Sequence, residues 1–168
     1  MSLLVTALTR QHDRTDFDCG EPELNGFLQR MARQQADRDF NRTYVAVLEG
    51  SARIHGFYSV SSASIDFQNW PEHLRLPRYP VPAMRIGRLA VNRTEQGNGV
   101  GLMLLQHAMQ LATTTAQQIG LYAVVVDAKH EKAAAFYERY GFTRFPFEPL
   151  ALFITTDMIR RAFKAANA

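Results

Sequence analysis

The stretch Met84–Gly101 (MRIGRLAVNRTEQGNGVG) decides how this chain folds. Its first part, Met84–Val91, is dominated by apolar residues and predicts a strand. Gln96–Gly101 then places three glycines within six residues. After this turn, apolar side chains recur at the spacing of one helix face, at Leu102, Leu105, Met109 and Ala112. The sequence therefore predicts a strand that leads through a glycine turn into a helix.

The glycine turn has the composition of an anion-binding site. Glycines at the start of a helix let consecutive backbone N–H groups face one ligand, and the helix dipole adds about half a positive charge there. No Gly-Lys-Ser/Thr follows, and Gly97, Gly99 and Gly101 alternate, so neither the P-loop nor the dinucleotide-binding spacing is present. Turns of this kind also occur without a ligand. The spacing alone therefore leaves a phosphate site and a purely structural turn equally open.

The chain before this stretch predicts a strand, a helix and a hairpin. Leu3–Leu8 reads as a first strand. After Asp18-Cys19-Gly20 a helix is expected, with Pro22 in its first turn and a core stripe at Leu24, Phe27, Leu28 and Met31. Two β-rich runs, Thr43–Glu49 and Ile54–Ala63, predict an antiparallel hairpin. The proline-rich stretch Gln68–Pro82 is expected to be irregular and to serve as a binding loop.

The chain after the glycine turn predicts two strands and two helices. We expect a buried strand at Leu121–Asp127, a helix at Lys129–Tyr140 that ends at Gly141, and a strand at Leu150–Thr155 before a short basic helix. The fold class is therefore α+β with a mixed sheet. A length of 168 residues with 46% hydrophobic content fits one domain spanning residues 1–168 and excludes intrinsic disorder as the main state.

Cysteine content and charge restrict the cellular setting and the partners. One cysteine, Cys19, closes no intramolecular disulfide, and neither a secretory segment nor a long apolar run is present. We expect a cytoplasmic protein that does not use a membrane. Of 19 basic residues 16 are arginines, the side chain that suits phosphate, although a coding bias explains this equally well. The stretch Gln68–Arg93 is basic and contains a single acid, Glu72.

Two motifs resemble the GNAT superfamily of N-acetyltransferases. Gln96, Gly99 and Gly101 match its signature Gln/Arg-x-x-Gly-x-Gly/Ala, and Phe136-Tyr137 with Gly141-Phe142 resembles its Phe-Tyr-x-x-x-Gly-Phe segment. The resemblance implies a mixed, mostly antiparallel sheet flanked by helices. It also implies a splay between the Met84–Val91 and Leu121–Asp127 strands, with acetyl-CoA in the opening.

A narrower resemblance extends over nearly the whole chain. Phe17-Asp18-Cys19-Gly20, Leu24-Asn25 and Gly87-Arg88-Leu89-Ala90-Val91 are similar to the GNAT toxins of bacterial toxin–antitoxin pairs. The resemblance implies acetylation of the α-amino group of aminoacyl-tRNA, which blocks translation. It also implies a ribbon-helix-helix antitoxin as partner and a homodimer.

Tyr137 is the one side chain that we assign to chemistry. The resemblance places it beside the sulfur of CoA, where a phenol of pKa near 10 can protonate a departing thiolate. An α-amino group, with a pKa near 7.7–8.0, is already neutral in a substantial fraction at cellular pH and needs no strong base. This agrees with the lack of paired carboxylates near the motifs. Without the resemblance, Tyr137 reads more readily as a core aromatic.

Further residues are assigned to binding. Leu89 and Val91 are expected to offer backbone groups to the pantetheine arm, with their side chains in the core. The pyrophosphate is expected on the turn formed by Gln96, Gly97, Asn98, Gly99, Val100 and Gly101. Phosphates of tRNA are expected on Arg75, Arg78, Arg85 and Arg88, although a solvated strand face is an equal interpretation for Arg85 and Arg88.

The five histidines lack metal-ligand spacing, so no metal is expected. Cys19 is expected to be a buried hydrophobe.

Two other functions remain open on the sequence. The first is a GNAT enzyme that acts on a small amine or a peptide N-terminus. The second is an inactive module that binds CoA or an antitoxin. The basic stretch favours a nucleic-acid substrate, and the intact Gln96, Gly99, Gly101 and Tyr137 disfavour the inactive module. Which amino acid the tRNA carries is beyond the reach of the sequence.

Overall fold

The computed structural model describes residues 2–167, which divide into two compact units. The first unit contains Met1–Ser61 and Gly87–Ala108, and the second contains Ser62–Ile86 and Met109–Ala168, each taken over the described residues. Because the sequence expectation covers residues 1–168, its two end residues lie outside this description. The expectation of a single domain stays a prediction.

Seven strands form one sheet with the order β1-β2-β3-β4-β5-β7-β6. Pairing is antiparallel between β1 and β2, β2 and β3, β5 and β7, and β6 and β7, whereas β4 and β5 are parallel. The predicted class, a mixed and mostly antiparallel sheet with helices, is confirmed. The strands are β1 Leu3–Ala7, β2 Arg42–Leu48, β3 Gly56–Ile65, β4 Val81–Val91, β5 Ala123–Asp127, β6 Thr143–Phe145 and β7 Glu148–Thr155.

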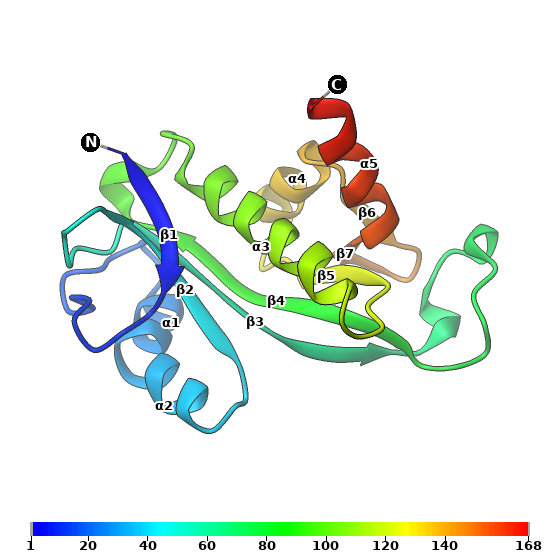
Figure 1. Cartoon of the computed structure of the whole chain (residues 1–168), viewed down its shortest axis with the longest axis horizontal. Coiled ribbons are helices and arrows are strands. Elements are labelled where there is room, and N and C mark those ends of the chain that lie inside the picture. The colour runs from blue at the N-terminus through cyan, green and yellow to red at the C-terminus, as the bar shows by residue number, and fades with distance from the viewer. Residues whose placement is uncertain (1, 168) are drawn as a thin grey trace. The chain divides into compact units, whose positions relative to one another are not determined.

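In the first unit, the predicted helix is interrupted by a wider π-helical turn. It consists of α1 Pro22–Gly26, the π turn Phe27–Met31 and α2 Ala32–Asp37, which packs on β2 (Figure 1). The Ala32 N–H donates to the Phe27 carbonyl, five residues back. This extra residue rotates the following positions, so Ala32 is fully buried whereas Met31 is 41% exposed. The expectation that Met31 belongs to the core stripe is therefore wrong, while Leu24, Phe27 and Leu28 are buried as predicted.

The rest of the first unit contains the strand, glycine turn and helix that the sequence predicts from Met84 onward. Strand β4 is followed by a short 3₁₀ turn at Arg93–Glu95, by the glycines, and by α3 Val100–Ala116. Both β4 and α3 continue into the second unit. The order predicted for Met84–Gly101 is confirmed, and β4 begins at Val81, three residues earlier than expected.

The second unit is built around Trp70. Its ring packs edge-on against Tyr122, Phe145 and Phe153, with centroids 4.9–5.5 Å apart. The loop before β4 is irregular as predicted, apart from 3₁₀ turns at Phe67–Asn69 and Glu72–Leu74. Helices α4 Glu131–Arg139 and α5 Thr156–Ala166 both contact β7.

The parallel pairing of β4 with β5 is short. It joins Ala83–Ile86 to Ala123–Val126 and ends there, although β4 continues to Val91. Strand β5 itself ends one residue later, at Asp127, and the predicted splay between the two strands stays a prediction. Over residues 2–167, no helix combines the length and the apolar character that crossing a membrane requires.

Candidate functional site

The glycine turn is an exposed segment with a special backbone. Gly97 and Gly99 adopt φ values of +88° and +85°, which side-chain-bearing residues rarely adopt. A Cβ atom added at either position would meet no atom within 4 Å, so the backbone conformation, rather than packing, favours glycine there. Residues 96–99 are exposed, and Val100, the first residue of α3, is 2% exposed. The turn therefore presents its backbone to solvent just before a buried anchor.

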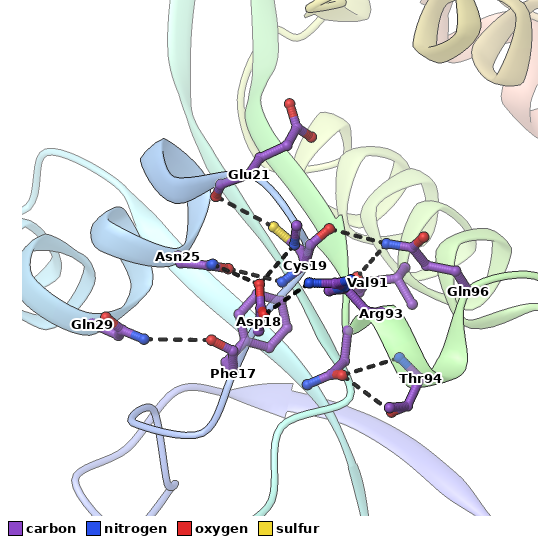
Figure 2. A network of polar contacts seen from close by, with 12 residues as sticks. Phe17, Asp18, Cys19, Glu21, Asn25, Gln29, Val91, Arg93, Thr94 and Gln96 are labelled. Atoms are coloured by element: carbon purple, nitrogen blue, oxygen red, sulfur yellow. Dashed lines mark hydrogen bonds and ion pairs between the residues drawn. The ribbon is translucent and has the colours of Figure 1, made fainter.

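Polar contacts from a distant segment hold the start of this turn (Figure 2). Gln96 Nε2 donates to the Cys19 carbonyl and to the Val91 carbonyl, both at 3.1 Å. The Arg93 N–H donates to the Asp18 carbonyl at 2.8 Å, and the Arg93 guanidinium lies 3.5 Å from Asp18 Oδ2. Gln96 was predicted to bind the cofactor. Its side-chain amide bonds two backbone carbonyls of the protein, and the cofactor-binding role of the residue stays a prediction.

The 3₁₀ turn before Gln96 is also fixed by polar groups. The Asn92 side chain accepts from the Thr94 N–H at 3.2 Å, and Glu95 Oε1 accepts from Arg53 Nη1 at 2.9 Å. His55 Nδ1 lies 3.1 Å from the same Glu95 oxygen. Burial would raise the pKa of the Glu95 carboxyl, but hydrogen bonds from Thr94 and Arg53 outweigh it and lower that pKa. The charged carboxylate of Glu95 thus holds the 3₁₀ turn to Arg53 within the first unit.

Tyr137 lies in the second unit, on the buried face of α4. It is 5% exposed, and its ring packs edge-on against Phe136 and Phe142 at 5.2 and 5.3 Å. Burial raises the pKa of its phenol, so the hydroxyl keeps its proton throughout the physiological range. The helix is capped by His130 Nδ1, which accepts from the Ala133 N–H at 3.1 Å, and Gly141 ends it with φ +101°. This environment accommodates both interpretations of Tyr137, core aromatic and proton donor.

Two of the four predicted RNA-binding arginines are engaged within the fold. Arg85 on β4 forms an ion pair with Asp127 at the end of β5. Arg88 stacks its guanidinium 3.7 Å from the centroid of the Phe27 ring, and burial lowers its pKa. Both side chains are therefore occupied by intramolecular partners, a situation that strand alternation alone does not reveal.

The other two arginines lie in the loop before β4. Arg75 and Arg78 are exposed, and Arg75 adopts a left-handed φ of +51°. Arg75 lines a cavity of about 290 Å³ together with Phe67, Gln68, Trp70, Pro71, Glu72 and Leu76. Of the four predicted RNA-binding arginines, Arg75 and Arg78 are thus the two with exposed side chains.

The burial of Leu89, Val91 and Cys19 can be compared directly with the sequence-based expectation. Leu89 and Val91 are half-buried rather than in the core, whereas Ala90 between them is 6% exposed. The expectation that both side chains lie in the core is therefore wrong, since each of them keeps part of its surface exposed. Cys19 is 7% exposed, and burial raises the pKa of its thiol, as expected for a buried hydrophobe. Over residues 2–167, no three His, Cys, Asp or Glu side chains gather as a metal site.

The residues predicted to form the site are divided between the two units of the structure. Gln96–Gly101 and Arg88 belong to the first unit, whereas Tyr137, Arg75, Arg78 and Arg85 belong to the second. Asp18 and Asn25 belong to the motifs that resemble the GNAT toxins, and the sequence predicts no role for either side chain. Their position beside Gln96 comes from contacts between residues far apart in the chain.

Comparisons with known proteins agree with this architecture. The family model described as "Acetyltransferase (GNAT) domain" matches residues 39–144. A "tRNA-acetylating toxin" of Mycobacterium tuberculosis (strain ATCC 25618 / H37Rv) is 38% identical over 144 residues, which cover 84% of this chain and 85% of that protein.

Two solved structures resemble the whole chain. AtaT complexed with acetyl-methionyl-tRNAfMet has a TM-score of 0.89 at 29% identity, covering 96% of this chain and 99% of that one. An AtaT mutant toxin bound to acetyl-CoA and to the C-terminus of the antitoxin AtaR has a TM-score of 0.84 at 28% identity, covering 98% and 99%.

Proposed function

Because this chain belongs to the GNAT acetyltransferase family, we propose that it transfers the acetyl group of acetyl-CoA to the α-amino group of aminoacyl-tRNA. It would thereby block translation as the toxin of a toxin–antitoxin pair. The observation that carries this proposal is the 38% identity, over most of both chains, to a tRNA-acetylating toxin. The likeness to AtaT in complex with acetyl-methionyl-tRNAfMet supports the same substrate class.

The glycine turn fits a pyrophosphate. Gly97 and Gly99 leave open space where a Cβ would stand, and the first N–H groups of a helix have no intrahelical acceptor. Gly97, Asn98, Gly99, Val100 and Gly101 would supply these backbone groups, while Gln96 holds the turn in place. Acetyl-CoA supplies the activated acetyl thioester when bound, and backbone atoms of Leu89 and Val91 would orient its pantetheine arm.

Tyr137 is proposed as the general acid. Its phenol carries a proton at cellular pH, as general acid catalysis requires, while burial raises its pKa and so makes it a weaker acid than a phenol in water. A substantial fraction of the attacking α-amino group is neutral at cellular pH, so it requires no carboxylate base. The proposed machinery is therefore small: a backbone turn, a strand edge and one hydroxyl.

The proposal extends to partners and setting. We propose an antitoxin as partner, supported by the complex of an AtaT mutant toxin with the C-terminus of the antitoxin AtaR, and we propose that it is of the ribbon-helix-helix class. We also propose a homodimer in the cytoplasm, where charged tRNA is made, and a single acetyltransferase domain that includes both units. Arg75 and Arg78 are proposed as contacts to RNA phosphates.

The direct test is acetylation of charged tRNA. Purified protein is incubated with labelled acetyl-CoA and a pool of aminoacyl-tRNA, and label on the RNA is counted before and after alkaline release of the amino acid. We expect label that is lost on release, since it lies on the aminoacyl group. Label on small amines or peptide N-termini without label on RNA would replace this proposal by the small-amine enzyme. Absence of label on every acceptor would favour the inactive module.

A further inference from the structure

The segment Asp18–Gly20 is locked by hydrogen bonds of two side chains, those of Asn25 and Asp18 (Figure 2). The Cys19 N–H donates to Asn25 Oδ1 at 2.9 Å, and Asn25 Nδ2 donates to Asp18 Oδ1 at 3.0 Å. Asp18 Oδ1 also accepts from the Gly20 N–H at 2.9 Å. Gly20 has φ +92°, which lets the chain turn back into α1. Asn25 thus uses both ends of its amide to fix this segment.

The locked segment aims its carbonyls at the residues that precede the glycine turn. The Asp18 carbonyl accepts from the Arg93 N–H, and the Cys19 carbonyl accepts from Gln96 Nε2. The same Gln96 nitrogen reaches the Val91 carbonyl, so its two protons serve two segments far apart in the chain. Because residues 96–99 are exposed, the turn relies on Gln96 at one end and on buried Val100 at the other.

We infer that Asn25 is a positioning residue for the Gln96–Gly101 turn, acting through the Cys19 carbonyl and the Gln96 amide. This inference rests on the proposed function, in which that turn binds the pyrophosphate of acetyl-CoA. N–H groups that must converge on one anion bind more tightly when their loop is already ordered. Asn25 itself lies in α1 and has no assigned contact with the cofactor, so its effect is transmitted entirely by protein groups.

A double-mutant cycle tests this connection. Asn25→Ala removes the lock, and Gln96→Leu removes the amide with little change in size. Each single variant should weaken acetyl-CoA binding about tenfold, which is about 1.4 kcal/mol, because the turn loses hydrogen bonds that keep it ordered. The double variant should bind about as weakly as the weaker single variant, because both changes break one connection. Calorimetric titration supplies the dissociation constants.

Two further variants sharpen the cycle. Gln96→Arg keeps N–H donors at the position and should restore most of the affinity. Gln29→Ala is the matched control, because Gln29 Nε2 donates to the Phe17 carbonyl at 3.4 Å, beside the lock but without a connection to Gln96. Its affinity should equal that of the wild type. Activity at saturating acetyl-CoA should retain its kcat in Asn25→Ala, while KM for acetyl-CoA rises. Additive losses in the double variant, or wild-type binding by Asn25→Ala, would overturn the inference.

Cys19 offers a second readout that requires no cofactor. It is the single cysteine of the sequence and is 7% exposed, so its modification by a thiol reagent reports opening of the locked segment. Labelling should accelerate in folded Asn25→Ala and Gln96→Leu but stay slow in Gln29→Ala. Unchanged labelling in both of the first two variants would also overturn the inference. Failure of the wild type to bind acetyl-CoA would instead refute the proposed function, and labelling alone would then decide whether Asn25 holds the turn.

Discussion

At the scale of single residues, the hydroxyl of Tyr137 is the group with the clearest predicted effect. Tyr137→Phe removes one oxygen and keeps the ring that packs against Phe136 and Phe142, so the fold and the acetyl-CoA affinity should persist. Acetylation of charged tRNA should fall by about 10²–10⁴, the usual worth of general acid–base catalysis. Label transfer under single-turnover conditions measures the loss. A variant as fast as the wild type would leave Tyr137 as a core aromatic only.

Gly99 is the second residue with a sharp expectation. Gly99→Glu strains a φ of +85° and places a negative charge where the pyrophosphate is proposed to lie, so binding of acetyl-CoA should be lost. Gly50→Glu is the matched control, since Gly50 has φ +78°, lies in the same unit and also has open space around its Cβ position. Equal loss in both variants would point to backbone strain, and retained binding by folded Gly99→Glu would move the cofactor elsewhere. Calorimetry with acetyl-CoA separates these outcomes.

At the scale of elements, strands β2 and β3 meet α3 through an aromatic cluster. Tyr58 Oη lies 2.5 Å from His107 Nδ1, and Tyr44 stacks on Tyr58 at 5.2 Å. Burial lowers the pKa of His107 below its ordinary value of about 6.5, because desolvation disfavours the imidazolium. As the pH falls through about 6.5, His107 is protonated in the unfolded chain but stays neutral in the folded chain. The contribution of His107 to the free energy of unfolding is therefore complete above that pH and is lost as the pH falls below it.

The pH dependence expected from His107 can be measured as a change in the stability of the folded protein. In urea titrations, the free energy of unfolding of the wild type should drop between pH 7.5 and pH 5.5 by more than that of His107→Gln. Glutamine keeps an acceptor for Tyr58 but does not titrate, so the difference between the two proteins isolates His107 from the other titrating groups. Parallel pH curves for the two proteins would show that His107 has no part in the pH dependence.

At the scale of the whole molecule, charge should govern the association with tRNA. Arg75 and Arg78 are exposed, whereas Arg85 is paired with Asp127 and Arg88 is stacked on Phe27. Each phosphate contact contributes about 0.7–0.9 to the slope of log affinity against log salt. Replacing Arg75 and Arg78 by glutamine should flatten that slope by about one to two, measured by filter binding across a salt series.

The matched control for the loop arginines is Arg160→Gln with Arg161→Gln on exposed positions of α5. These changes remove the same charge and should leave the slope unaltered. A flattened slope in the control together with an unaltered slope in the loop variant would place the RNA surface on α5 instead.

Much of this protein follows from its sequence alone, because the relevant signals are local. The apolar period of β4 and α3, and the glycines that permit positive φ at Gly97 and Gly99, predict the strand, turn and helix directly. The family motifs at Gln96–Gly101 and Phe136–Phe142 indicate the enzyme class for the same reason. A motif states which residue types stand at which spacing, and that is a property of the chain itself.

Tertiary structure decided the features that depend on distant residues. The β6 strand has only three residues and is defined by its pairing with β7. The π turn that moves Met31 out of the core cannot be predicted from an ideal helical period. Gln96 and Cys19 are 77 positions apart, so no local pattern shows that their groups bond. The same holds for Arg85 and Arg88, whose charges are held within the fold. Hydrogen bonds and burial form between groups that folding brings together, and residue spacing along the chain does not record which distant groups will meet.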